Sequence, residues 1–153
     1  MIILYTSLIF SCVWLGVLQA KKLSTREMFY ENLLGFLRAF NSNLSFVQKG
    51  YMELVDEYLE SGVGAEFEAF LSGINSGEKH NLEFLSAREI KDVENIVLSL
   101  GKNDEETERR LVEDAIKVVS EKKERATKNC MKYSSFSIKL SLLVGALLVI
   151  LLL

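Results

Sequence analysis

Histidine and cysteine, the residues behind most metal and nucleophile chemistry, are nearly missing from this sequence. It has one histidine, His80, and two cysteines, Cys12 and Cys130, which lie far apart. Zinc and redox sites use Cys and His at short spacing, and Ser/His/Asp sets and HExxH helices need histidine. Glycine-rich phosphate-binding loops of the GxxxxGK[ST] or GxGxxG type do not occur either. We therefore expect no enzymatic activity, no metal site and no cofactor.

Acidic side chains are common, but their placement favours folding over acid–base catalysis. Glu105 and Glu106 stand at the expected start of a helix, where the helix dipole stabilises negative charge. The chain carries 18 Lys and Arg against 21 Asp and Glu, a net charge of −3. A nucleic-acid footprint requires a clustered basic face, so we expect no nucleic-acid partner.

The two ends of the chain predict membrane segments. Met1–Ala20 contains no charged residue, and twenty helical residues span about 30 Å, the hydrocarbon thickness of a bilayer. The last fourteen residues include eleven that are Leu, Val or Ile. We predict transmembrane helices over residues 1–20 and 136–153, flanking a cytosolic helical bundle over residues 21–135. A signal peptide cleaved after Ala20 is the alternative, although no Lys or Arg precedes the first apolar run as a signal peptide requires.

Basic residues flank both apolar ends on the side of the intervening domain. The positive-inside rule counts Lys and Arg near the ends of a span and places such flanks in the cytoplasm. We therefore predict a protein of the cell membrane with two spans and a cytoplasmic domain. The residues that determine this topology are Lys21, Lys22, Arg26, Lys122, Lys123, Arg125, Lys128 and Lys132.

Apolar spacing locates the helices of the domain, and the absence of proline favours long ones. Steps of three and four predict an amphipathic helix with the inward residues Met28, Phe29, Leu33, Phe36, Leu37, Phe40, Leu44 and Val47. Short helices are expected over Met52–Leu59 and Ala65–Leu71. Gly73–Asn81, rich in Gly, Ser and Asn, predicts a solvated loop. The fold class is therefore all-α.

A tight corner is predicted between the last two helices. Ser86 and Glu89 fit a capping box at the start of the first of these helices. Its expected inward residues are Ile90, Val93, Ile96, Val97 and Leu100. Gly101 stands where a left-handed, helix-ending residue belongs, and Asn103 is the expected N-cap of the last helix. That helix is predicted to face inward with Leu111, Ala115, Val118 and Val119. The candidate partner contact is the corner itself, Gly101, Lys102, Asn103 and Asp104.

The corner also carries a family resemblance. Leu98 to Thr107 reads Leu-Ser-Leu-Gly-Lys-Asn-Asp-Glu-Glu-Thr and leads into a long charged helix. With an apolar segment at each end of the chain, this pattern resembles the stage III sporulation protein AB family of endospore-forming bacteria. The resemblance implies an antiparallel bundle of about six helices. Such a bundle is similar to the cytoplasmic domain of the inner-membrane platform proteins of type II secretion and type IV pili.

The resemblance further implies a mother-cell channel complex that contacts the forespore. The implied partners are a secretion-type ATPase and other membrane proteins of the complex, and the chain is a candidate homo-oligomer. The leading hypothesis is thus a non-catalytic platform that couples the ATPase to the membrane assembly. The competing hypothesis is a generic bitopic scaffold or sensor whose helical domain binds a soluble regulator. A third, an exported protein held only by its C-terminal span, requires cleavage after Ala20.

Overall fold

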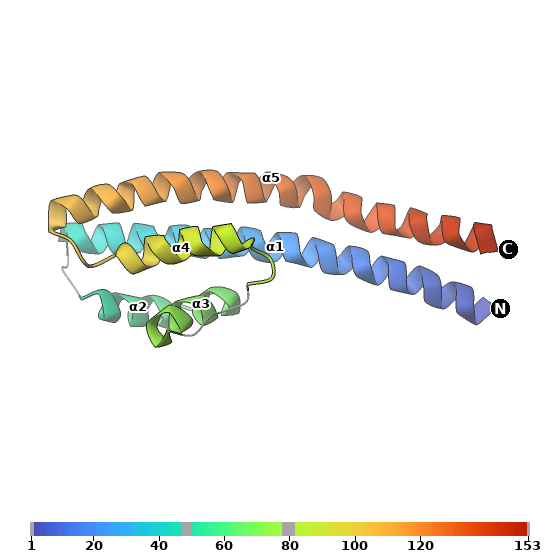
Figure 1. The fold of residues 1–153 in the computed structure, drawn as a ribbon, viewed down its shortest axis with the longest axis horizontal. Helices are drawn as coiled ribbons and strands as arrows, with labels where there is room; N and C mark the ends of the chain where they lie inside the picture. The colour runs from blue at the N-terminus through green and yellow to red at the C-terminus, as the bar shows by residue number, and fades with distance from the viewer. Residues whose placement is uncertain (1, 47–49, 78–81, 153) are drawn as a thin grey trace. The chain divides into compact units, whose positions relative to one another are not determined.

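The computed structural model of the chain describes residues 2–46, 50–77 and 82–152. The described residues form helices and no strands, so the all-α prediction is confirmed (Figure 1). The helices are α1 (Ile2–Phe46), α2 (Tyr51–Glu60), α3 (Ala65–Ser76), α4 (Ala87–Ser99) and α5 (Glu105–Leu152). The resemblance implies about six bundle helices beside two membrane segments, whereas the described residues form five helices in all. Helices α1 and α5 each continue unbroken from a predicted membrane segment into the bundle, which accounts for two of the three missing helices, and the bundle itself has one helix fewer than implied among the described residues.

The chain divides into two compact units, which are described separately. The bundle unit is Met28–Glu124, and the terminal unit combines Met1–Glu27 with Arg125–Leu153. Both α1 and α5 contribute residues to each unit.

Aromatic side chains from three helices form the core of the bundle unit. Phe29 of α1 and Phe67 and Phe70 of α3 are at most 2% exposed, and their ring centroids lie 5.3–6.2 Å apart. Phe36 adds an edge-to-face contact with Tyr58 of α2 at 5.4 Å. Such pairs contribute about 0.5–1.5 kcal/mol each beyond the area that they bury. The predicted inward stripe of α1 is confirmed at its centre.

The two ends of that stripe differ from the prediction. Met28 is 53% exposed because it lies on the outer side of α1. Leu44 is half-buried, and Val47 lies outside the described residues.

Helix α3 is longer than predicted and takes in the first part of the expected loop. It runs to Ser76 and ends at Gly77, whose φ of 75° is left-handed and whose N–H donates to the Gly73 carbonyl. Gly73 is buried and Ile74 is half-buried, so the inward face that starts at Phe67 continues for another turn. The Gly and Ser content suggested a loop, but tertiary burial of this face outweighs it. The remainder of the predicted loop, with His80, lies outside the described residues.

Helix α4 begins and ends as predicted. The Ser86 hydroxyl accepts from the Glu89 amide at 3.3 Å, and the Glu89 carboxylate accepts from the Ser86 amide at 3.0 Å. The other Glu89 oxygen accepts from the Tyr30 hydroxyl at 3.0 Å, which ties this cap to α1. Val93, Val97 and Leu100 are buried. The other two predicted inward residues, Ile90 and Ile96, are half-buried.

Helix α5 buries a different stripe from the one that its sequence suggests. Val112 and Val119 are fully buried, whereas Leu111 is 42% and Val118 is 47% exposed. The prediction that α5 faces inward is therefore confirmed for Val119 and wrong for Leu111 and Val118. Ala115 is half-buried. The helix carries apolar residues on two adjacent faces, and the neighbouring helices cover only one.

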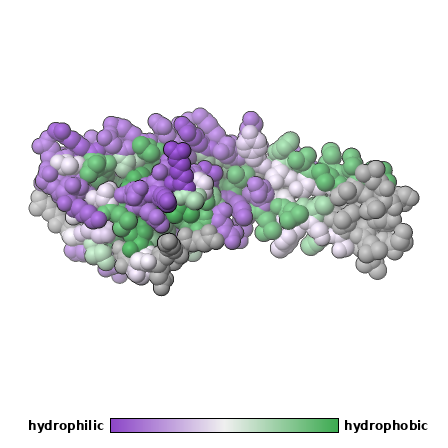
Figure 2. All heavy atoms as spheres, viewed as in Figure 1, coloured by the Kyte–Doolittle hydropathy of each residue, from purple (hydrophilic) through white to green (hydrophobic). Residues whose placement is uncertain are grey.

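In the terminal unit the two helices approach closely through small residues. A Cβ added to Gly16 of α1 would lie 2.6 Å from the Ser141 hydroxyl and 3.1 Å from the Ser137 carbonyl, both of α5. Large apolar side chains point outward instead, and Phe10, Trp14, Leu15, Leu142, Leu143 and Ile150 are 55–72% exposed. Figure 2 shows hydrophobic side chains on the visible face of this unit.

The predicted membrane segments, residues 1–20 and 136–153, lie within α1 and α5. Over the described part of the chain, no helix is both long enough and apolar enough to cross a membrane. Met1 and Leu153, the outermost residues of those spans, lie outside the described residues.

Replacing Gly101 with valine is expected to destabilise the chain. Its φ is 76°, and an added Cβ would lie 3.2 Å from the Tyr51 Cβ. A β-branched residue in this left-handed region costs about 1–3 kcal/mol, so urea unfolding of the purified chain should show a loss of that size. Gly77→Val is the matched control, because its φ is 75° and no atom of the described residues lies within 4 Å of the added Cβ. It should cost less, and an equal loss would show that the Tyr51 contact is irrelevant.

Candidate functional site

A buried carboxylate organises the corner between α4 and α5. Glu108, one turn into α5, is only 1% exposed. Its Oε1 accepts from the Gly101 amide at 2.7 Å, and its Oε2 accepts from the Asn103 amide at 3.3 Å and from Asn103 Nδ2 at 3.0 Å. Hydrogen bonds to an ionised group are about twice as strong as neutral ones, and a buried charge requires them. Glu108 therefore holds the loop over its own helix.

The sequence predicted Asn103 as the N-cap of α5, but the N-cap is Asp104. Its carboxylate Oδ2 accepts from the Thr107 amide at 3.2 Å, and its carbonyl accepts from the Glu108 amide at 2.8 Å. Hydrogen bonds from the Thr107 side chain, and next from the Thr107 amide, lower the pKa of Asp104. Asn103 instead donates its backbone N–H and its side-chain Nδ2–H to Glu108.

The predicted contact residues therefore have different surroundings. Gly101, Lys102, Asn103 and Asp104 are all exposed at the surface of the bundle unit. Gly101 and Asn103 are held by Glu108, and Asp104 caps the helix. Lys102 alone among the four makes no hydrogen bond or ion pair in the described structure.

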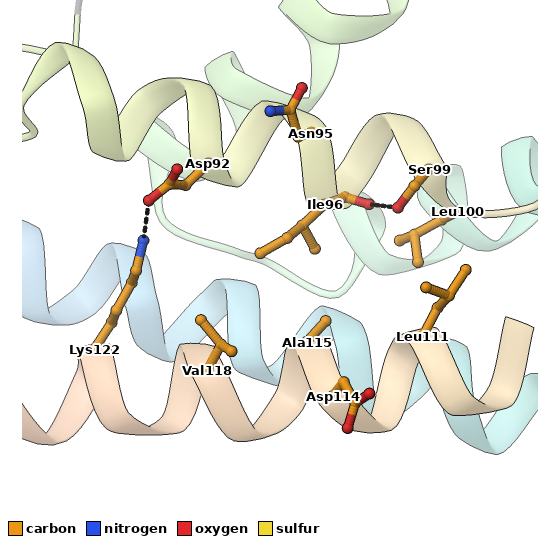
Figure 3. A pocket seen from close by; sticks show the side chains of 10 residues that line it. All are labelled: Asp92, Asn95, Ile96, Ser99, Leu100, Leu111, Asp114, Ala115, Val118 and Lys122. Atoms are coloured by element: carbon orange, nitrogen blue, oxygen red, sulfur yellow. Dashed lines mark hydrogen bonds and ion pairs between the residues drawn. The ribbon is translucent and has the colours of Figure 1, made fainter.

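A groove of about 420 Å³ runs between α4 and α5, next to this corner (Figure 3). We call it the α4–α5 groove. Helix α4 and its end contribute Asp92, Asn95, Ile96, Ser99 and Leu100, and α5 contributes Leu111, Asp114, Ala115, Val118 and Lys122. Leu111 and Val118, which were wrongly predicted to be buried, line one wall of this groove.

An ion pair closes one end of the groove. Lys122 Nζ lies 2.9 Å from Asp92 Oδ2, and the Lys122 side chain is only 21% exposed. Figure 3 shows this pair bridging the two helices, with Val118, Ala115 and Leu111 following along α5. Lys123 pairs with Glu31 of α1 at 3.1 Å. Two of the residues predicted to determine topology therefore have partners within the bundle unit.

The other predicted topology residues belong to the terminal unit. Lys21, Lys22, Arg125, Lys128 and Lys132 are exposed and Arg26 is half-buried. Lys132 lies over the ring of Tyr133, 5.2 Å from its centroid. On the same unit, burial raises the pKa of the Cys130 thiol, and a hydrogen bond and the charge of Glu27 raise it further.

A family profile described as stage III sporulation protein AB matches residues 49–153, which is more than half of the chain. The chain belongs to the stage III sporulation protein AB family. The resemblance inferred from the corner sequence is therefore confirmed. No curated protein and no solved structure matches the chain.

Within this stage III sporulation protein AB family member, the matched residues include the corner, Glu108 and the α4–α5 groove. Sequence reasoning missed Glu108, although a signal exists. Glu108, Val112, Ala115 and Val119 follow each other at steps of four, three and four, so a charged residue occupies an inward position. A carboxylate at such a position requires donors, and the adjacent loop supplies them.

Replacing Glu108 with glutamine is expected to lower the free energy of unfolding by about 1–3 kcal/mol. Glutamine keeps the shape but loses the charge, and its amide nitrogen would face the donors of Gly101 or Asn103. Urea unfolding measures the loss, and hydrogen exchange at these two amides should become faster.

The matched control is Glu105→Gln. Glu105 is 56% exposed and pairs with Arg109 at 3.4 Å, an arrangement that contributes only about 0–1 kcal/mol. Equal effects of the two substitutions, or unchanged exchange in Glu108→Gln, would contradict the role given to Glu108.

Proposed function

We propose that this chain is a non-catalytic membrane platform of a secretion-like channel complex between mother cell and forespore. Family membership implies a role related to sporulation. In this proposal the chain couples a cytosolic ATPase to the membrane assembly, which is more specific than the role that family membership implies. The observation that carries it is the contrast between the two units. One exposes large apolar side chains, and the other exposes charge around an apolar groove.

The packing of the terminal unit supports membrane attachment. Helices in lipid associate through small residues that let backbones approach, while large apolar side chains face the acyl chains. Gly16, Ser137 and Ser141 provide the close approach here, and Trp14 and Leu143 are examples of the outward residues. The proposed location is the mother-cell membrane, with two spans and the bundle unit in the cytoplasm. Basic residues near both spans favour that orientation.

The α4–α5 groove supports an assembly role for the bundle unit. It offers an apolar surface beside a corner that Glu108 holds in one geometry. The proposed partners are a secretion-type ATPase and other membrane proteins of the same complex, by analogy with type II secretion and type IV pilus platform proteins. A self-associating platform is part of the proposal.

The same groove also suits a second candidate function, a bitopic scaffold or sensor whose bundle unit binds a soluble regulator. Gene neighbourhood separates the two, because an adjacent gene for a secretion-type ATPase favours the platform.

Membrane attachment is tested by substitution on the terminal unit. Leu15 and Leu143 are 65% and 60% exposed, and an aspartate at the centre of a span costs about 2.5–3.5 kcal/mol. Leu15→Asp combined with Leu143→Asp should move the chain from the membrane pellet to the alkaline extract. Met52→Asp, at a 53% exposed residue of the bundle unit, should stay in the pellet.

The orientation is tested by a reporter inserted between Lys79 and Asn81. This reporter should be cytosolic, and a reporter on the outer side would refute the orientation.

The platform function is tested genetically and by co-purification. Deleting the gene in a spore former should stop development after engulfment, and a wild-type copy should restore it. Normal spore yield after deletion would end the proposal. The tagged full chain should also retain a secretion-type ATPase after mild detergent extraction, whereas the sensor function predicts recovery of a soluble regulator without the ATPase.

A further inference from the structure

We infer that the α4–α5 groove binds one amphipathic α-helix of another protein. This helix presents apolar side chains at positions i, i+3 or i+4, and i+7, with a Lys or Arg beside that stripe. The inference rests on the proposed function in taking the groove as the surface where the platform meets another component.

The dimensions of the groove match a short helix. On α4 it extends from Asp92 to Leu100, and on α5 from Leu111 to Lys122, which correspond to about 12 and 16 Å of helix. The two walls are antiparallel neighbouring helices joined by the corner (Figure 3). A third helix of about three turns laid between them would contact both along their lined length.

The spacing of the wall residues is that of a helix-packing seam. Leu111, Ala115, Val118 and Lys122 follow each other at steps of four, three and four, as core positions of a coiled coil do. Ala115 is the smallest of them and leaves a hollow between Leu111 and Val118. These two remain 42% and 47% exposed, so α4 covers this second seam of α5 only in part. A side chain from a partner helix would fill the hollow as a knob fills a hole.

Other kinds of occupant fit the groove less well. Small-molecule pockets bury about 70–90% of their ligand, whereas this groove is open to solvent along its α5 wall, where Leu111 and Val118 are 42% and 47% exposed. Proline-rich segments bind grooves lined by aromatic residues, and none of the ten lining residues is aromatic. An added β-strand needs a sheet edge, and the described residues form no strand. Recognition of an amphipathic helix fits this lining better than any of these three.

Charge on the rim sets the polarity of the occupant. Three of the ten lining residues are charged: Asp92, Asp114 and Lys122. Lys122 forms an ion pair with Asp92. Asp114 pairs only with Lys117 at 3.2 Å, and both side chains are about three-quarters exposed. Such a pair contributes little, so Asp114 can exchange Lys117 for a cation of the partner. Asn95, which lines the groove from α4, is a neutral amide. A Lys or Arg on the α5 side of the occupant is therefore favoured.

The test selects ligands for the full chain in detergent micelles. The probe is a display library of helical peptides about four turns long, with one face randomised and Val118→Lys used for counter-selection. Enriched peptides should carry the i, i+3 or i+4, i+7 apolar stripe with Lys or Arg beside it. Enrichment of proline-rich or acidic peptides would overturn the inference, and so would equal enrichment on the Val118→Lys chain.

Matched variants then measure binding of one selected peptide by fluorescence anisotropy. Val118→Lys should weaken binding about tenfold or more. Leu98→Lys should change it less than about twofold, because Leu98 is equally exposed at 47% but does not line the groove. Asp114→Lys should weaken binding of the selected peptide. A peptide whose Lys or Arg is changed to Glu should restore binding to the Asp114→Lys chain. Equal effects of Val118→Lys and Leu98→Lys would overturn the assignment of the site.

Self-association provides the remaining outcome. If Val118→Lys converts a dimer of the full chain to a monomer and no selected peptide competes with the dimer, the occupant is a second copy and the inference is wrong. Peptide binding is measured on the purified chain and spore development in cells. Failure of the inference and failure of the platform function are therefore distinguishable.

Discussion

The buried Glu108 carboxylate is the constraint on which the corner and the groove depend. A carboxylate that is 1% exposed is tolerated only if donors surround it. Here the donors are the Gly101 amide and the backbone and side-chain amides of Asn103. The left-handed Gly101 lets the backbone turn back over α5 so that these groups reach it. One side chain thus fixes how α4 passes into α5, and the two groove walls owe their adjacency to that turn.

The aromatic core explains why one face of this helix pair remains open. Phe29 and Phe36 of α1 pack on α2 and α3, and the Tyr30 hydroxyl holds the start of α4 through Glu89. The covered side of α5 is consequently the one with Val112 and Val119. Its adjacent apolar face meets α4 only along one wall, which produces a groove instead of a second core. Lys122 and Asp92 close its end as a partly shielded pair.

The terminal unit is packed on a different principle from the bundle unit. In the bundle unit, large aromatic side chains lie inside and charged ones outside, as expected when water drives burial of apolar surface. In the terminal unit, Gly16 and Ser141 lie at the contact of the two helices, and large apolar residues such as Phe10 and Ile150 face outward. The two backbones approach each other closely at this contact.

The sequence by itself determined the local features of this protein. The Ser86–Glu89 capping box and the left-handed Gly101 depend on hydrogen bonds between residues close in sequence. The corner sequence was also sufficient to suggest the family. The inward centre of α1 was also predictable, because α1 has one strong apolar stripe. Only the tertiary structure decided which face of α5 is buried, because that helix has apolar residues on two adjacent faces. The sequence predicted Asn103 as the N-cap, but folding brings Glu108 under the loop, where the Asn103 N–H groups donate to it. Asp104 caps the helix instead, because its carboxylate accepts from the Thr107 amide.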